Sequence, residues 1–321
     1  MSAPELSADL RSSLEAKLHG LARDEIATRA AQISKTNRDG GNSRVIATQT
    51  DALAYALVRM PATYAAVVAS LGALVELKPD FAPDSLLDVG AGPGTASWAA
   101  AETFSSLQRF TLLDINAALQ TLALEFGRDH PRLAAMTCRR DIHALDEAEP
   151  ADLVIASYLI GEVGKAERRT FAERLWAKTR DTLLVVEPGT PAGYARVIEL
   201  RAQLIADGAH VAAPCPHDGQ CPLSAPDWCH FAQRLPRLRA HIQIKGAELP
   251  FEDEKFSYVV LTREPPLKRS PRVLAPPVVG KVEVSAKLCT ANGVEVTKVA
   301  RRDKAAYAKA RRWRWGDGLS D

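Results

Sequence analysis

The chain has 321 residues, with 46% hydrophobic and 25% charged, which is the mixture of a soluble globular protein with one large domain or two ordinary ones. It lacks the roughly 18 uninterrupted apolar residues of a membrane helix. The N-terminus carries acidic residues early and has no continuous apolar run, which predicts no targeting peptide, so we expect a cytoplasmic protein with no membrane partner. The net charge of +2 is unevenly distributed: residues 263–321 carry 14 basic and 6 acidic residues, which predicts a polyanionic partner, namely RNA.

Residues 1–80 are predicted to form an N-terminal helical region. Apolar residues recur at helical spacing over residues 7–33, with Ser7 as a candidate N-cap. The polar run 35–44 predicts a loop. A second helix is expected to stop at Pro61, and a third to follow it up to residue 77.

From residue 81 to 262, short apolar runs alternate with helical patterns, which predicts a parallel sheet with right-handed crossovers. The expected strands are residues 85–90, 109–114, 134–141, 151–159 and 181–188, and the expected helices are 95–104, 117–129, 165–179 and 192–208. Residues 240–246 and 256–264 are expected to pair and finish the sheet, and residues 209–235 form a cysteine-rich insertion.

Residues 263–321 are predicted to be a basic C-terminal extension. The five prolines of residues 263–280 suggest a linker, and alternating residues on both sides of Asn292-Gly293 predict a β-hairpin. The expected fold class is therefore α/β, with a seven-stranded sheet between a helical region and a small hairpin extension.

A glycine-rich loop follows the first expected strand. Gly90, Gly92 and Gly94 have the spacing G-x-G-x-G between a strand and a helix, which allows a ligand to approach the backbone closely. Asp88 at the end of the strand would repel a pyrophosphate but suits an ammonium or hydroxyl group. These features favour S-adenosylmethionine, which carries an ammonium group and a ribose but no phosphate.

Two further acids follow the next strands. Asp114 is expected to bind the ribose hydroxyls, and Asp141 with Ile142 to meet the adenine. Over roughly residues 80–262 this pattern resembles the class I methyltransferases. After the fourth strand, where amino-group methyltransferases carry Asn/Asp-Pro-Pro-aromatic, this chain has Ser157, Tyr158 and Glu162, so the residues leave methyl transfer open.

Three of the five cysteines lie within fifteen residues: Cys215, Cys221 and Cys229. Buried thiols, a disulfide and a metal site are all compatible with this clustering, and the expected compartment favours a metal. The spacings differ from the close cysteine pairs of zinc sites, whereas Cys-Pro recurs in iron–sulfur proteins. From residue chemistry both metals stay open, with Cys289, His217 or His230 as a fourth ligand.

The chain resembles the methyltransferase-like assembly factors of the mitochondrial small ribosomal subunit and their bacterial relatives. The matching stretches are "AYALVRMPATYAAV" (54–67), "LLDVGAGPGT" (86–95), "VVEPGTPAGY" (185–194), "PCPHDGQCPL" with "WCHFAQR" (214–234) and "LCTANG" (288–293). The resemblance implies a [4Fe–4S] cluster on Cys215, Cys221, Cys229 and Cys289, and a role in small-subunit maturation with binding to rRNA. Because no targeting sequence is predicted, a bacterial cytoplasm is the expected setting.

Three functions therefore compete. The first is an assembly factor, expected to be monomeric, in which Arg311, Arg312 and Arg314 neutralise rRNA phosphates while Trp313 or Trp315 stacks on unpaired bases. The second is an active S-adenosylmethionine-dependent rRNA methyltransferase, supported by the glycine loop. The third is a redox or iron sensor whose cluster controls RNA binding.

Overall fold

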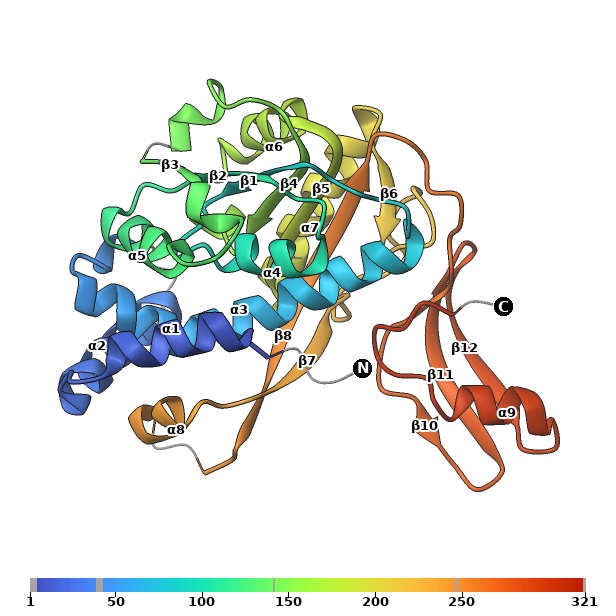
Figure 1. The fold of residues 1–321 in the computed structure, drawn as a ribbon. Coiled ribbons are helices and arrows are strands. Elements are labelled where there is room, and N and C mark those ends of the chain that lie inside the picture. The colour runs from blue at the N-terminus through green and yellow to red at the C-terminus, as the bar shows by residue number, and fades with distance from the viewer. Residues whose placement is uncertain (1–4, 39–42, 141, 246–247, 320–321) are drawn as a thin grey trace.

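A mixed sheet of eight strands is the centre of the structure, a computed structural model that describes residues 5–38, 43–140, 142–245 and 248–319 (Figure 1). The strand order is β3-β2-β1-β4-β5-β8-β6, with β7 also paired to β8. The bounds are β1 Ser85–Val89, β2 Arg109–Leu113, β3 Thr137–Arg139, β4 Ala151–Ser157, β5 Thr179–Pro188, β6 His210–Ala213, β7 Phe231–Pro236 and β8 Phe251–Thr262. Strands β1 to β5 are parallel and β8 is antiparallel to β5, which confirms the class I methyltransferase arrangement.

Helices cover both faces of this sheet, and each face has its own hydrophobic core. Alternate residues of one strand belong to different cores: Leu86 packs with α3, α4 and α5, whereas Leu87 packs with α6 and α7. This alternation follows from the two-residue period of a strand and explains why the strands are apolar on both faces. The helix bounds are α1 Ala8–Leu18, α2 Arg23–Arg38, α3 Gln49–Leu77, α4 Thr95–Thr103, α5 Ala117–Gly127, α6 Arg168–Ala177, α7 Pro191–Ala206, α8 Arg239–Lys245 and α9 Lys304–Ala310, with short 3₁₀ turns at Ser43–Val45, Leu133–Ala135, Ile142–Leu145 and Ile160–Glu162.

The N-terminal region is helical, as predicted. Ser7 caps α1 by accepting a hydrogen bond from the Leu10 amide at 3.3 Å. The expected break at Pro61 is wrong, because α3 runs without interruption through this proline. The proline removes one backbone hydrogen bond, but α3 is buried along most of its length and tertiary packing outweighs this local loss.

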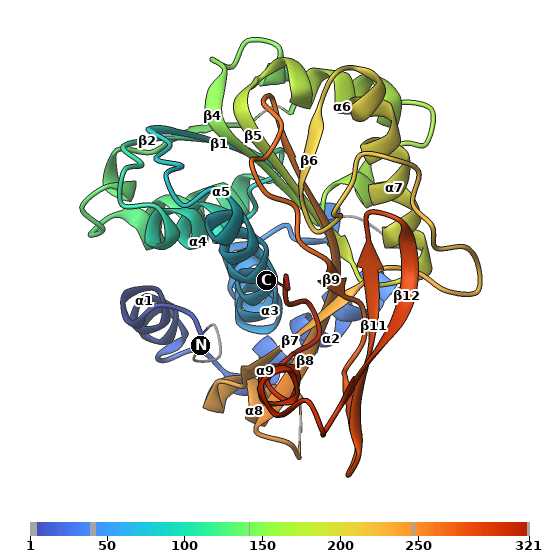
Figure 2. The same cartoon turned by 90° about the vertical axis from the view of Figure 1, so that its right-hand side faces the viewer.

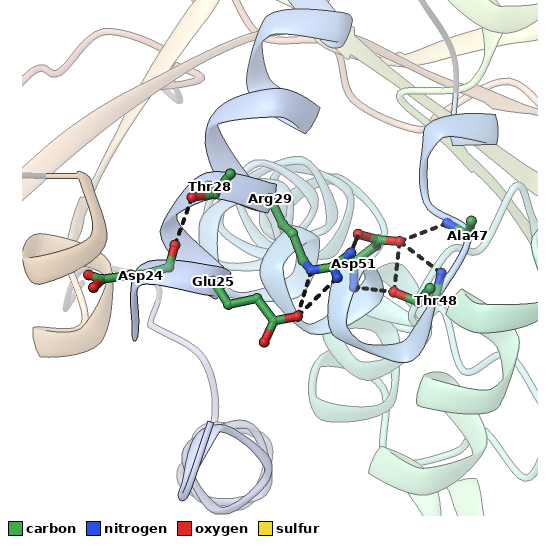
Figure 3. A network of polar contacts seen from close by, with 7 residues as sticks. All are labelled: Asp24, Glu25, Thr28, Arg29, Ala47, Thr48 and Asp51. Carbon is green, nitrogen blue, oxygen red and sulfur yellow. Dashed lines mark hydrogen bonds and ion pairs between the residues drawn. The ribbon is translucent and has the colours of Figure 1, made fainter. Parts of the chain in front are cut away.

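The first turn of α3 is fixed by a polar network (Figure 3). Thr48 and Asp51 form a capping box, in which the Thr48 hydroxyl accepts from the Asp51 amide at 3.2 Å and the Asp51 carboxylate accepts from the Thr48 amide at 2.8 Å. Arg29 of α2 donates to the other carboxylate oxygen of Asp51 at 2.6 Å. The network therefore ties α2 to the start of the central helix.

By length and composition, α3 also qualifies as a helix that crosses a membrane. However, 67% of its most apolar window is buried inside the protein, where it packs on α4, α5 and β8. Its apolar character is therefore explained by its place as a core helix.

The end of the main sheet differs from the prediction. Residues 240–246 were expected to be a strand, but α8 covers Arg239–Lys245, where the Ile242 amide bonds to the Leu238 carbonyl at 3.0 Å. The two-residue alternation in this stretch is too short to distinguish a strand from a helix that packs one side on α2 and α3. The last edge of the sheet is instead shared by β6 and β7, which pair with opposite halves of β8.

The C-terminal extension forms a second, antiparallel sheet. Its order is β10-β11-β12, with β9 also paired to β11, and the bounds are β9 Arg272–Val273, β10 Val278–Val279, β11 Glu283–Thr290 and β12 Gly293–Ala300. The predicted hairpin is confirmed as β11 and β12. The expected linker 263–280 contributes the two short strands β9 and β10, which pair with β11 and extend the hairpin into a sheet. Figures 1 and 2 show this small sheet beside the main domain, on the side where β6 ends.

Candidate functional site

The glycine loop connects β1 to α4 at the carboxyl edge of the sheet. Gly90 adopts φ +70°, and a Cβ built on it would lie 2.7 Å from Cδ1 of Leu159. Gly94 has φ +77° at the N-cap of α4, a conformation that side-chain-bearing residues adopt at a cost. The loop geometry therefore requires the glycines that the sequence places there.

Asp88 stabilises this loop from inside the protein. Its side chain is fully buried, and Oδ2 accepts from the Ser97 amide at 3.0 Å and from the Ser97 hydroxyl at 2.7 Å. Burial raises the pKa of Asp88 to about 7. Asp88 does not line the neighbouring cleft, so the structure gives it a support role and does not place it against a ligand.

Asp114 lies at the end of β2 and does line the cleft. Its two carboxylate oxygens accept from the amides of Gly92 and Asn116, both at 2.7 Å. Burial raises its pKa, and each oxygen keeps lone-pair capacity for a further donor. Ile142 begins a 3₁₀ turn, and Asp141 lies outside the described residues.

The cleft has a volume of about 650 Å³ and extends from the glycine loop across the ends of β1, β2 and β4. Ligands of open α/β sheets bind at this edge. Ser157, Tyr158 and Glu162, the residues in the expected acceptor region, all line the cleft.

Tyr158 has an unusual conformation for a bulky residue, with φ +56°. Its hydroxyl donates to Oε1 of Glu254 at 2.7 Å, and Arg59 donates to the same oxygen at 3.3 Å. Glu254 was missed by sequence reasoning, because β8 and β4 are separated by almost a hundred residues. The network gives the half-buried Arg59 an ion-pair partner, Glu254.

The four cysteines implied by the family resemblance line one cavity. Cys215, Cys221 and Cys229 come from the segment 214–230, which connects β6 to β7, whereas Cys289 lies on β11 of the small sheet. Because β6 and β7 pair with the same edge of β8, both ends of the segment return to that edge. All five cysteines are free thiols, and Cys138 on β3 is not part of the cavity.

The thiols are partly shielded from solvent, since Cys289 is buried and Cys215, Cys221 and Cys229 are half-buried. Burial raises the pKa of Cys215 and of Cys229, and raises that of Cys289 to about 12. The Tyr194 hydroxyl lies 3.1 Å from Sγ of Cys221. Nε2 of His217 is 4.0 Å from Sγ of Cys289, although neither His217 nor His230 lines the cavity.

The ligand geometry distinguishes between kinds of metal site. Among the described residues, no three His, Cys, Asp or Glu side chains converge closely enough to hold a single metal ion. A zinc ion needs its sulfurs about 2.3 Å from one centre, whereas an iron–sulfur cluster occupies a larger volume between its thiolates. The four thiols that line the cavity match the number of thiolates that hold an iron–sulfur cluster.

The predicted RNA-binding residues have different environments. Arg311, Arg312 and Arg314 are exposed. Trp313 packs on the core of the small sheet, and the Trp315 ring lies 4.9 Å from the ring of His230. Both tryptophans are half-buried, so packing accounts for them in this structure.

Comparison with known proteins identifies relatives. The family model "Mitochondrial small ribosomal subunit Rsm22" matches residues 49–320. The human "Ribosome assembly protein METTL17, mitochondrial" is 30% identical over 289 residues, covering 83% of this chain and 62% of that protein. The Schizosaccharomyces pombe "Rsm22-cox11 tandem protein 2, mitochondrial" is 26% identical over 327 residues, covering 84% and 43%. The chain therefore spans less than two thirds of either relative.

Similar solved structures include two methyltransferases. Magnesium protoporphyrin IX methyltransferase from Synechocystis PCC 6803 is 13% identical, with a TM-score of 0.41 and coverage of 77% of this chain and 100% of that one. An O-methyltransferase family protein from Burkholderia thailandensis is 14% identical, with a TM-score of 0.43 and coverage of 67% and 60%.

Proposed function

The chain belongs to the Rsm22 family of the mitochondrial small ribosomal subunit, and on this premise we propose that it is an assembly factor of the small ribosomal subunit that binds rRNA. One observation carries the proposal beyond family membership. Four cysteines from two distant segments line a single cavity between the methyltransferase-like sheet and the basic extension. A group bound there would hold a basic surface in a fixed orientation on the main domain.

The proposed RNA-binding surface is the exposed basic part of the extension. It comprises Arg301, Arg302, Arg311, Arg312 and Arg314, all of which are exposed. Arginine recognises phosphate through its planar set of donors, and each phosphate neutralised releases counterions. The proposal therefore requires binding that weakens strongly as salt increases.

We assign S-adenosylmethionine to the 650 Å³ cleft. The Asp114 carboxylate would accept hydrogen bonds from the ribose hydroxyls, while Gly90 and Gly92 would allow the ligand to approach the backbone at the N-terminal end of α4. When bound, this cofactor supplies an electrophilic methyl group. An active rRNA methyltransferase is the second candidate, favoured by the continuation of the cleft to Tyr158 and Glu162.

We assign a [4Fe–4S] cluster to Cys215, Cys221, Cys229 and Cys289. The donor set fits, because four thiols line the cavity and no carboxylate does among the described residues. The cluster would supply a covalent connection between the segment 214–230 and β11. A structural function is favoured, since the four thiols come from two segments that are distant in the sequence and meet at one cavity.

Binding measurements test the assembly-factor proposal. Small-subunit rRNA should bind more tightly than tRNA, and the slope of log affinity against log salt should decrease when Arg311, Arg312 and Arg314 are replaced by Gln. Equal affinity for both RNAs, or affinity independent of salt, would refute RNA recognition. Transfer of label from S-adenosylmethionine to immature small-subunit particles would support the methyltransferase instead.

Iron and sulfide analysis of anaerobically purified protein tests the cluster, with four of each expected per chain. The bacterial cytoplasm stays a prediction, because the curated relatives are mitochondrial by name. The monomeric state also stays a prediction, which sedimentation can check.

A further inference from the structure

Two buried arginines face the cysteine cavity. Arg201 on α7 and Arg272 on β9 are each only 2% exposed, and both line the cavity together with the four cysteines. Within the described parts of the chain, neither guanidinium forms an ion pair with an aspartate or glutamate. A buried charge without a partner of opposite sign costs several kcal/mol, so this arrangement needs an explanation.

The contacts of Arg201 satisfy it only in part. Its Nη2 donates to the carbonyls of His217 and Gly219 at 2.7 and 2.9 Å, within the stretch between Cys215 and Cys221. Its Nε is buried and has no hydrogen-bond partner in the part of the chain that the structure describes. Arg201 therefore shapes the cysteine segment and keeps an unused donor in the protein interior.

Arg272 connects three parts of the site. Its Nε donates to the carbonyl of Pro214, next to Cys215, at 3.2 Å, and its Nη1 donates to the carbonyl of Gly316 at 2.8 Å. Its backbone is paired with Cys289 across β9 and β11. Both acceptors are neutral carbonyls, so the positive charge of Arg272 is also left without compensation.

The missing negative charge has a natural source in the cavity. Four neutral thiols supply none, but four thiolates bound to an iron–sulfur core outweigh the positive charge of that core. The complex is then anionic, and reduction by one electron adds a further negative charge. Hydrogen bonds and nearby charges are known determinants of the reduction potential of such clusters.

We propose that Arg201 and Arg272 are the counter-charges of the cysteine cavity: they stabilise an anionic, thiolate-bound cluster and raise its reduction potential. This inference rests on the cluster assignment made above. Both arginines are positioning residues, since they act on the ligands and on the charge of the group and take no part in a reaction.

The test compares R201Q and R272Q with the charge-conserving R201K and R272K. R234Q is the control, because Arg234 of β7 pairs with Asp253 of β8 at the protein surface, away from the cysteine cavity. Iron and sulfide content, circular dichroism and the midpoint potential are measured for each anaerobically prepared protein. Each Gln variant should lower the ratio of reduced to oxidised cluster at least tenfold at a fixed potential, which is a shift of 59 mV for one electron. The Lys variants should stay within threefold of wild type.

The outcomes separate the inference from the cluster assignment. A wild-type protein without iron and sulfide overturns both. A loaded wild type whose Gln variants match R234Q in cluster content and potential overturns the inference alone. If the Gln variants fail to fold or to load while the Lys variants do both, the requirement for charge is supported. If Lys fails as Gln does, the arginines act through hydrogen-bond geometry and the counter-charge is refuted.

Discussion

Replacement of Cys289 by alanine is the sharpest test of the four-cysteine cavity. Cys289 is the one cavity thiol that belongs to the small sheet, and 60 residues separate it from Cys229. A cluster bound by both segments closes a loop of that length. The chain-entropy relation for a cross-link of about 60 residues gives roughly 4 kcal/mol of stabilisation.

Cys289→Ala should therefore lose the cluster and its cross-link together. The expected fall in melting temperature is roughly 10 °C, from about 4 kcal/mol at 2–4 °C for each kcal/mol. Cys138→Ala is the control, since Cys138 is also a free thiol but lies on β3, outside the cavity. Iron content and thermal melts are measured for both, before and after removal of iron by a chelator.

The Cys138→Ala control distinguishes the loss of a ligand from the loss of any free thiol. Cys138→Ala should keep the iron and melt close to wild type, and chelated wild type should melt close to Cys289→Ala. If Cys289→Ala retained four irons, or if both variants melted within 2 °C of each other, β11 would not supply a ligand.

Three further predictions concern the cleft and the helical region. Gly90→Ala should weaken S-adenosylmethionine binding by about tenfold in calorimetry, because the left-handed backbone costs about 1–2 kcal/mol and the new Cβ meets Leu159; an unchanged Kd would contradict this. Burial raises the pKa of Asp88 to about 7 from an ordinary value near 3.8, so the native state binds this proton more tightly than the unfolded state does. The wild type should therefore lose stability relative to Asp88→Asn as pH rises from 4 to 7. A difference in free energy of unfolding in urea that stayed constant over this pH range would argue against it. Burial raises the pKa of Asp51, but hydrogen bonds from Thr48 and Arg29 outweigh burial and lower the pKa overall. Asp51→Ala should therefore reduce the free energy of unfolding by about 2 kcal/mol at pH 7, and by progressively less as pH falls below the ordinary pKa range of a carboxyl. A reduction independent of pH would disprove the role of the ionised carboxylate.

The parts of the fold that the sequence predicts are those fixed by local patterns. The strands β1, β2, β4 and β5 are apolar runs buried on both faces, and their alternation with helices leaves few possible topologies. Pro61 and the stretch 240–246 were assigned wrongly, because tertiary packing decided both. A proline is tolerated in a helix that is buried along its length, and three alternating residues fit a helix that packs one side on the core.

The residues of the candidate site likewise divide into those required by local backbone geometry and those brought together only by folding. Glycines at φ +70° and +77° and an acid at the end of β2 are local requirements, so Gly90, Gly94 and Asp114 are visible in the sequence. Glu254 and Arg272 are not, because each acts on residues that only the folded chain brings near. An arginine in a sequence indicates exposure more often than burial, and the burial of Arg272 depends on the pairing of β9 with β11.

The half-buried residues Trp313 and Trp315 connect the exposed arginines of the tail to the small sheet and to the cysteine segment. Trp315 packs against His230, Lys287 pairs with Asp227, and Arg272 joins Pro214 to Gly316, so the small sheet is attached to the cysteine segment by several independent contacts. The exposed residues Arg311, Arg312 and Arg314 directly precede Trp315 and Gly316 in the chain. The orientation of these arginines therefore depends on the packing of Trp313 on the small sheet and on the contacts that attach this sheet to the segment 214–230 beside the cysteine cavity. A change that disrupts the cavity should consequently weaken RNA binding even when every arginine of the tail is intact.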